Sequence, residues 1–156
     1  MKVGQAFRDG LMGGLITLAV LLVAFMMNTL RLSQLPFQWQ VVAFIHHWPT
    51  LVGMLAIFFV LYGLIGIVYA LGFERIVREA SPAWGMLFAL PHMVFIGYLV
   101  GFLPAMGLWP SLLQPGPGLL FMNYFFAGPF VLLFSHFAYG ITMGLLYKPV
   151  AEPRLG

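Results

Sequence analysis

The sequence predicts an all-α integral membrane protein in which four transmembrane helices form a bundle. Four apolar stretches occupy most of the 156 residues, and each reaches the roughly 20 apolar residues that a helix needs to cross the hydrocarbon core. Hydrophobic residues make up 62% of the chain and charged residues only 7%, whereas soluble domains carry about 25% charged residues. The whole chain, residues 1–156, is therefore expected to form one membrane domain.

The four spans are expected at residues 10–30, 49–72, 83–103 and 120–147. Backbone groups inside lipid have no water to bind, so each span must satisfy its own hydrogen bonds as a helix. The alternating pattern of barrel strands is absent. The first span is too long for the apolar core of a signal peptide, and no small-residue cleavage site follows it, which predicts a retained segment.

The basic residues predict the orientation of the spans. With both termini in the cytoplasm, six of the seven lysines and arginines lie on the cytoplasmic side and only Arg31 lies on the other. Cytoplasmic loops carry an excess of lysine and arginine, so this N-in, C-in topology is expected. The basic residues are scattered along the chain, and they predict neither a nucleic-acid partner nor a polybasic lipid-binding patch.

An amphipathic segment at residues 36–47 precedes the second span. Its apolar residues, among them Phe37 and Phe44, share one helical face, and its polar residues share the other. This pattern predicts a helix that lies in the membrane interface. The simplest interpretation places His46 and His47 on the wet polar face. The alternative is that these two histidines contact a quinone headgroup or the extramembrane domain of a partner.

Small residues recur at four-residue spacing in every span: Gly10 and Gly14, Gly66 and Ala70, Gly97 and Gly101, and Gly140 and Gly144. Such residues let membrane helices approach closely, so they are expected to pack the bundle, with docking onto another subunit as the alternative. Residues 62–69 and 139–147 also resemble each other. A tandem duplication of a helical hairpin, with about 77 residues in each copy, would explain this likeness.

Two histidines fall within the third and fourth spans. Counted from the cytoplasmic boundary, His92 and His136 lie about 13 and 16 Å deep, so their rings are expected to face each other near the midplane. Two histidines on facing helices are the membrane form of a b-type haem site, and a chlorin would bind in the same way. Glycines in the same two spans, beside these histidines, would make room for the macrocycle: Gly97, Gly101, Gly140 and Gly144.

A structural role for both histidines is the alternative. His92 follows Pro91, which frees a backbone carbonyl that the imidazole could bind. His136 lies beside Ser135 and one turn from Tyr139, so an ordinary polar cluster between helices would also account for it.

No other set of residues predicts chemistry. The chain has no cysteine, which excludes thiolate metal sites and covalent haem attachment. It also lacks the helical zinc signature, and it has no carboxylate within a span centre to complete a serine triad or a proton relay. We therefore expect no catalytic residues and no metal site built from protein ligands, and the sequence argues against an enzyme.

The segment His136-Phe137-Ala138-Tyr139-Gly140-x-x-x-Gly144 resembles the closing motif of small, uncharacterised four-helix bacterial membrane proteins. The opening Gly10-x-x-x-Gly14-Leu15-Ile16-Thr17 resembles their first span. This resemblance implies the four-span architecture and a bacterial inner, or cytoplasmic, membrane, and it implies no particular activity.

Three functions are consistent with these patterns. The first is a non-catalytic accessory subunit of a larger membrane complex, respiratory or otherwise redox-active, and the many small-residue faces favour it. The second is an electron-transfer protein that holds haem b between His92 and His136, with quinone as a partner. The third is a small-solute transporter, for which Pro91 and Pro129 supply the signal of interrupted helices.

Overall fold

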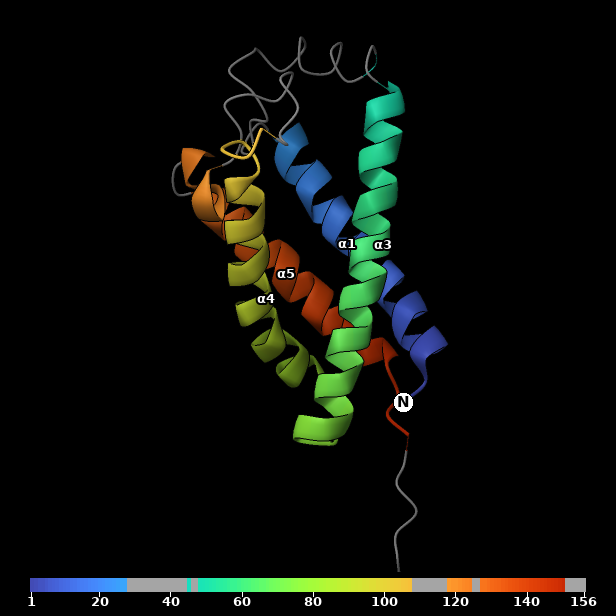
Figure 1. Ribbon diagram of the computed structural model, residues 1–156. Helices are drawn as coiled ribbons and strands as arrows, with labels where there is room; N and C mark the ends of the chain where they lie inside the picture. Colours follow the sequence, from blue (N-terminus) through green and yellow to red (C-terminus); the bar gives the residue numbers. More distant parts are fainter. Residues whose placement is uncertain (28–44, 46–47, 108–117, 125–126, 151–156) are drawn as a thin grey trace, which may run out of the picture.

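Four long helices cross one another in the computed structural model, which describes residues 1–27, 45, 48–107, 118–124 and 127–150 (Figure 1). They are α1 (Val3–Met26), α3 (Trp48–Gly72), α4 (Pro82–Phe102) and α5 (Ala127–Leu146). Each helix is long and apolar enough to cross a membrane. The predicted all-α fold with four such helices is therefore confirmed. The expected interfacial helix at residues 36–47, which includes His46 and His47, lies outside the described residues.

The helices differ most from the expected spans at the start of the first and the start of the last. α1 begins at Val3 rather than Gly10, so Asp9 lies within the helix. The last helix, α5, is described from Ala127, and at the expected start of the fourth span Leu120 and Phe121 have φ angles of 50° and 64°. Left-handed backbone of this kind cannot continue an α-helix, and it confines these residues to a short 3-10 segment, η3 (Leu119–Tyr124).

The connection between α3 and α4 is short and fully described. α3 continues as a π-helical turn, η1 (Phe73–Val77), and ends at Arg78, which has a φ of 59°. Ser81 then caps α4 by accepting a hydrogen bond from the Trp84 backbone N–H at 3.4 Å, and Pro82 occupies the first helical position. Serine at the cap and proline just inside it are preferred helix starts, so α4 can begin within four residues of Arg78.

The four helices form two hairpins that lie side by side. α1 packs along α3, α4 packs along α5, and α1 also packs along α5. The N-terminus of α1, the end of α3, the start of α4 and the end of α5 lie together at one end of the bundle, which we call the termini end (Figure 1). A hydrogen bond from the Gln5 side chain to the Leu146 carbonyl, at 3.4 Å, joins α1 to α5 there.

In each hairpin the two helices come close together where a glycine of one lies against a backbone carbonyl at the other. The Ala6 carbonyl touches Gly66 in the first hairpin, and the Ser81 carbonyl touches Gly144 in the second. A Cβ atom on either glycine would overlap the carbonyl oxygen. Ala6 and Ser81 are 75 residues apart. The contacts therefore repeat at nearly the interval that the sequence likeness predicts.

A second pair of glycines repeats the pattern one turn further along. A Cβ atom on Gly10 would lie 2.5 Å from the Tyr62 carbonyl oxygen, and one on Gly85 would overlap the Gly140 carbonyl oxygen. Gly10 and Gly85 are also 75 residues apart. The likeness between the two hairpins thus extends from their sequences to their helix crossings, where small residues allow close backbone contact.

The contacts between the hairpins break this likeness. Gly13 on α1 receives the Tyr139 ring of α5, and a Cβ atom there would lie 2.6 Å from the ring. The residue 75 positions later is Phe88 on α4, whose ring packs against Tyr69 and Phe73 of α3 at centroid distances of 6.0 and 5.5 Å. α1 therefore approaches α5 closely, whereas an aromatic side chain spaces α4 from α3.

The buried core is rich in tyrosine. Its members come from α1, α3, η1 and the end of α5: Ala6, Tyr62, Tyr69, Ala70, Phe73, Tyr139, Met143 and Tyr147. Large apolar side chains cover the outside of all four long helices, as expected of a bundle surrounded by lipid.

Candidate functional site

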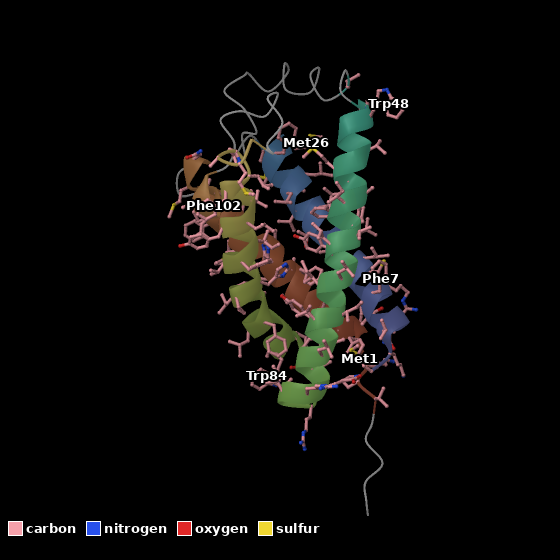
Figure 2. All side chains as sticks on the ribbon, viewed as in Figure 1. Met1, Phe7, Met26, Trp48, Trp84 and Phe102 are labelled. Carbon is pink, nitrogen blue, oxygen red and sulfur yellow. The ribbon has the colours of Figure 1, made fainter. Side chains whose placement is uncertain are left out.

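Five rings from three helices meet in the middle of the bundle, and we call them the central ring cluster. They are Tyr62 and Tyr69 of α3, His92 of α4, and His136 and Tyr139 of α5. His92 contacts the four other rings at centroid distances of 4.6 to 6.0 Å, all edge to face. Figure 2 shows that side chains of the long helices extend into the space between the helices as well as outward from the bundle. The structure thus brings together the two histidines that the sequence singled out.

His92 lies on the side of α4 that faces the other helices, and 9% of its surface is exposed. Its Nδ1 atom is 3.2 Å from the Tyr69 hydroxyl. Its Nε2 atom is buried and has no hydrogen-bond partner among the described residues. Within this part of the chain neither nitrogen binds a carbonyl freed by Pro91. The contact with Tyr69 instead links His92 to a neighbouring helix, which is a structural role of the kind common for histidines in membrane helices.

His136 is more fully buried than His92, with 2% of its surface exposed. Its Nδ1 atom is 2.8 Å from the Leu132 carbonyl oxygen. A carbonyl only accepts hydrogen bonds, so Nδ1 carries the proton and Nε2 of the neutral ring carries the lone pair. That Nε2 atom is buried and has no partner within the described chain. The Ser135 hydroxyl donates to the same carbonyl at 2.8 Å, which forms the local polar cluster expected here.

The two imidazole rings touch each other. Their centroids are 4.6 Å apart and their planes meet at 68°. Axial ligands on opposite faces of a haem iron, with nitrogen about 2 Å from the metal, would place the centroids about 6 Å apart. The observed separation does not accommodate a macrocycle between the rings. The glycines expected to leave room are also occupied, since Gly140 lies against Gly85 and Gly97 lies against Leu132.

Hydrogen bonds between helices fix the surroundings of the histidines. The Tyr139 hydroxyl donates to the Tyr62 carbonyl at 2.8 Å and so joins α5 to α3. The Thr17 hydroxyl lies 3.0 Å from the Gly13 carbonyl and 3.2 Å from the Ser135 carbonyl, which joins α1 to α5. Our sequence reasoning assigned no site role to Tyr62, Tyr69 or Thr17, because each acts through a partner on another helix.

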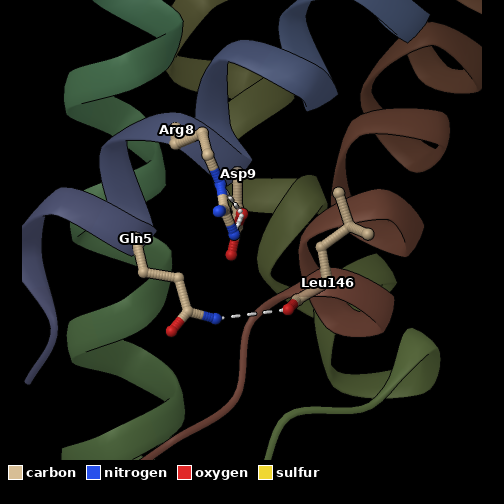
Figure 3. Close-up of polar contacts among 4 residues, drawn as sticks. All are labelled: Gln5, Arg8, Asp9 and Leu146. Atoms are coloured by element: carbon tan, nitrogen blue, oxygen red, sulfur yellow. Dashed lines mark hydrogen bonds and ion pairs between the residues drawn. The ribbon is translucent and has the colours of Figure 1, made fainter.

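Asp9 on α1 is a second buried polar group, which the sequence analysis missed. Its side chain is only 2% exposed, and one carboxylate oxygen is 2.9 Å from the largely exposed Arg8 guanidinium (Figure 3). The other oxygen, Oδ2, has no partner among the described residues. Asp9 precedes the expected first span, but it lies four residues before Gly13 and eight before Thr17, on one helical face. That spacing was the signal that could have revealed it.

Glu74 joins the two hairpins at the termini end. Its carboxylate accepts a 2.5 Å hydrogen bond from the Tyr147 hydroxyl and lies 3.0 Å from the Met1 amino group. The Val150 backbone N–H donates to the same carboxylate at 3.4 Å. Burial, together with the bond to Glu74, raises the pKa of Tyr147 to about 12. The neutral phenol is therefore the stable partner of this carboxylate.

Comparisons with known protein families, with characterised proteins and with solved structures found no match for this chain. Within the described residues, no group of three or more histidine, aspartate or glutamate side chains is placed to hold a metal ion. His46 and His47 lie outside this part of the chain. The central ring cluster is therefore the candidate site that the structure itself provides.

Proposed function

We propose that this protein is an accessory subunit of a larger membrane assembly, respiratory or otherwise redox-active. We further propose that it resides in a bacterial inner membrane with both termini in the cytoplasm, as the distribution of lysine and arginine predicts. The accessory role rests on the half of α3 furthest from the termini end, residues 52–61. This half is exposed on more than one side.

Val52, Gly53 and Met54 are successive residues and all three are exposed, although neighbouring positions on a helix point about 100° apart. A Cβ atom on Gly53 would meet no atom within 4 Å. Ala56, three residues later, is also exposed.

Spacing from α4 leaves this half of α3 with α1 as its principal neighbour. The Phe88 ring lies against the opposite half of α3, where it packs on Tyr69 and Phe73. Two exposed small residues, Gly53 and Ala56, then form the kind of surface on which another transmembrane helix packs closely. A helix of a partner subunit is the occupant that we propose.

Site-specific photo-crosslinking in native membranes tests this proposal. A photoreactive phenylalanine analogue at Ile57 of α3 should give one reproducible crosslink to a membrane protein. The same analogue at Phe134 of α5 should label lipid only. The two positions are matched, since Ile57 is 63% exposed and Phe134 is 60% exposed.

The size of the particle extracted in mild detergent gives a second readout. The wild-type chain should migrate with its partner, and Gly53→Trp should release it as a 17.4 kDa monomer while Phe134→Trp should not. A monodisperse wild-type monomer, with equal labelling from Ile57 and Phe134, would contradict the accessory role.

The alternative functions stay predictions. For a bis-histidine haem protein, the 4.6 Å ring separation would first have to widen, and a reduced-minus-oxidised visible spectrum of the purified chain would reveal a b-type band. A small-solute transporter would need interrupted helices. α4 runs without a break through Pro91 from Pro82 to Phe102, so the structure adds no support for that function.

A further inference from the structure

Three basic residues that are far apart in the sequence meet at the termini end, and we call them the basic cluster. Lys2 directly precedes α1, Arg75 lies in η1 at the end of α3, and Lys148 follows the end of α5 (Figure 1). All three residues are exposed. Because the basic residues are scattered along the chain, our sequence reasoning predicted no lipid-binding patch, and the fold alone creates this cluster.

Contacts of the Glu74 carboxylate bring the three segments together. This carboxylate accepts the hydrogen bond from the Tyr147 hydroxyl and lies 3.0 Å from the Met1 amino group. The Tyr147 hydroxyl also lies within hydrogen-bonding reach of the Lys2 backbone. Each member of the basic cluster directly follows one of the residues in these contacts. Consecutive Cα atoms are only about 3.8 Å apart, so the contacts hold the three long basic side chains around one place.

The protein leaves the charge of the basic cluster unbalanced. None of its three members belongs to an ion pair within the described part of the chain. Glu74, the carboxylate at its centre, already has partners of its own. Among the other described acidic residues, Asp9 pairs with Arg8. Glu79 accepts a hydrogen bond from the Trp84 indole. An anion that bound all three basic side chains would therefore relieve their mutual repulsion.

Apolar side chains border the basic cluster. Val3 and Ile76, which directly follow two of its members, are 50% and 74% exposed. Leu146, two residues before the third member, is 40% exposed. A ligand here meets positive charge on one side and apolar surface on the other. An anionic phospholipid has both matching parts, a phosphodiester headgroup and acyl chains, whereas a soluble phosphate has only the first.

The basic cluster also lies at the level where headgroups are found. It is at the ends of helices that are long and apolar enough to cross a membrane, and headgroups flank the hydrocarbon core that such helices span. Lysine and arginine at the end of a transmembrane helix attract anionic lipids. Arginine in addition binds phosphate through two parallel hydrogen bonds, which makes Arg75 the member best suited to fix the headgroup.

We propose that Lys2, Arg75 and Lys148 form a binding site for the phosphodiester headgroup of one anionic phospholipid. The inference goes beyond the accessory role, because the site lies at the opposite end of α3 from residues 52–61. It also goes beyond the orientation of the chain, since the rule that relates basic residues to topology requires no particular arrangement of them.

Native mass spectrometry of the purified full chain in mild detergent tests the site. Phosphatidylglycerol should bind to the wild type about tenfold or more tightly than phosphatidylcholine, which has a phosphodiester but no net charge. Arg75→Gln should weaken the binding of phosphatidylglycerol about fivefold, and substitution of all three members by glutamine should weaken it roughly a hundredfold. Arg78→Gln is the matched control. Arg78 is also an exposed arginine at the end of α3, but it adjoins none of the Glu74 contacts, so the affinity should change less than about twofold.

Three results would overturn the proposal. Equal affinity of the wild type for the two lipids would show that the headgroup charge is not recognised, and this comparison depends on the folding of no variant. Equal losses in Arg75→Gln and Arg78→Gln would assign the binding to general surface charge. Displacement of phosphatidylglycerol by an equal concentration of inorganic phosphate would assign the site to a free anion. None of these results bears on crosslinking at Ile57, so the accessory role stands or falls separately.

Discussion

The glycine crossing between α4 and α5 makes a sharp prediction about stability. In Gly85→Ala, the new Cβ atom would overlap the Gly140 carbonyl oxygen. Ordinary contact begins at 3.4 Å, so α4 and α5 would have to part by roughly 1.5 Å at a point where their backbones touch. Backbone atoms cannot rotate away as a flexible side chain can, and the helices must therefore move as units.

The expected loss follows from two opposing contributions. Overpacking a close contact costs about 1–3 kcal/mol, and parting the helices also weakens the dispersion contacts along the crossing. Alanine favours the helix over glycine by up to about 1 kcal/mol. The net destabilisation should be about 1–2 kcal/mol, which raises the unfolded-to-folded ratio roughly 5- to 30-fold.

Gly53→Ala is the matched control. It makes the same chemical change within α3, at a position where a Cβ atom meets nothing within 4 Å, so it should stabilise the protein by about 0.5–1 kcal/mol. Unfolding in mixed micelles of mild detergent and dodecyl sulfate, followed by circular dichroism, measures both variants. Equal stability of Gly85→Ala and Gly53→Ala would refute the account of the helix crossing.

Three further changes probe the polar interior. Gly13→Ala would place a Cβ atom 2.6 Å from the Tyr139 ring; a side chain yields more readily than a backbone, so its destabilisation in the same assay should be smaller than that of Gly85→Ala. Tyr139→Phe removes the hydrogen bond to the Tyr62 carbonyl and should cost about 0.6 kcal/mol and no more than about 1.7; a larger loss would mean that the hydroxyl has another role. Asp9→Asn removes a buried charge whose only described partner is the exposed Arg8, so the variant should be at least as stable as the wild type. A clear loss of stability would show that the carboxylate binds a cation or a partner.

The sequence by itself determined the number of membrane-crossing helices. Length and hydropathy are properties of each segment. An uncharged segment inside lipid must satisfy its own backbone hydrogen bonds, and an α-helix does so. Counting residues along two such helices also brought His92 and His136 to one level, because the rise per residue of an α-helix is constant. The four-residue spacing of small residues likewise predicted Gly66 and Gly144 as packing positions.

Only the tertiary structure decided what these residues touch. The burial of Asp9 depends on the helices that pack against α1, and the contact of His92 with Tyr69 depends on how closely α4 approaches α3. The distance between the two imidazole rings, 4.6 Å between their centroids, likewise depends on how α4 packs against α5. Such contacts arise between helices that are distant in sequence. Period and composition report which face of a helix is buried, but they carry no information about its partner or the distance to it.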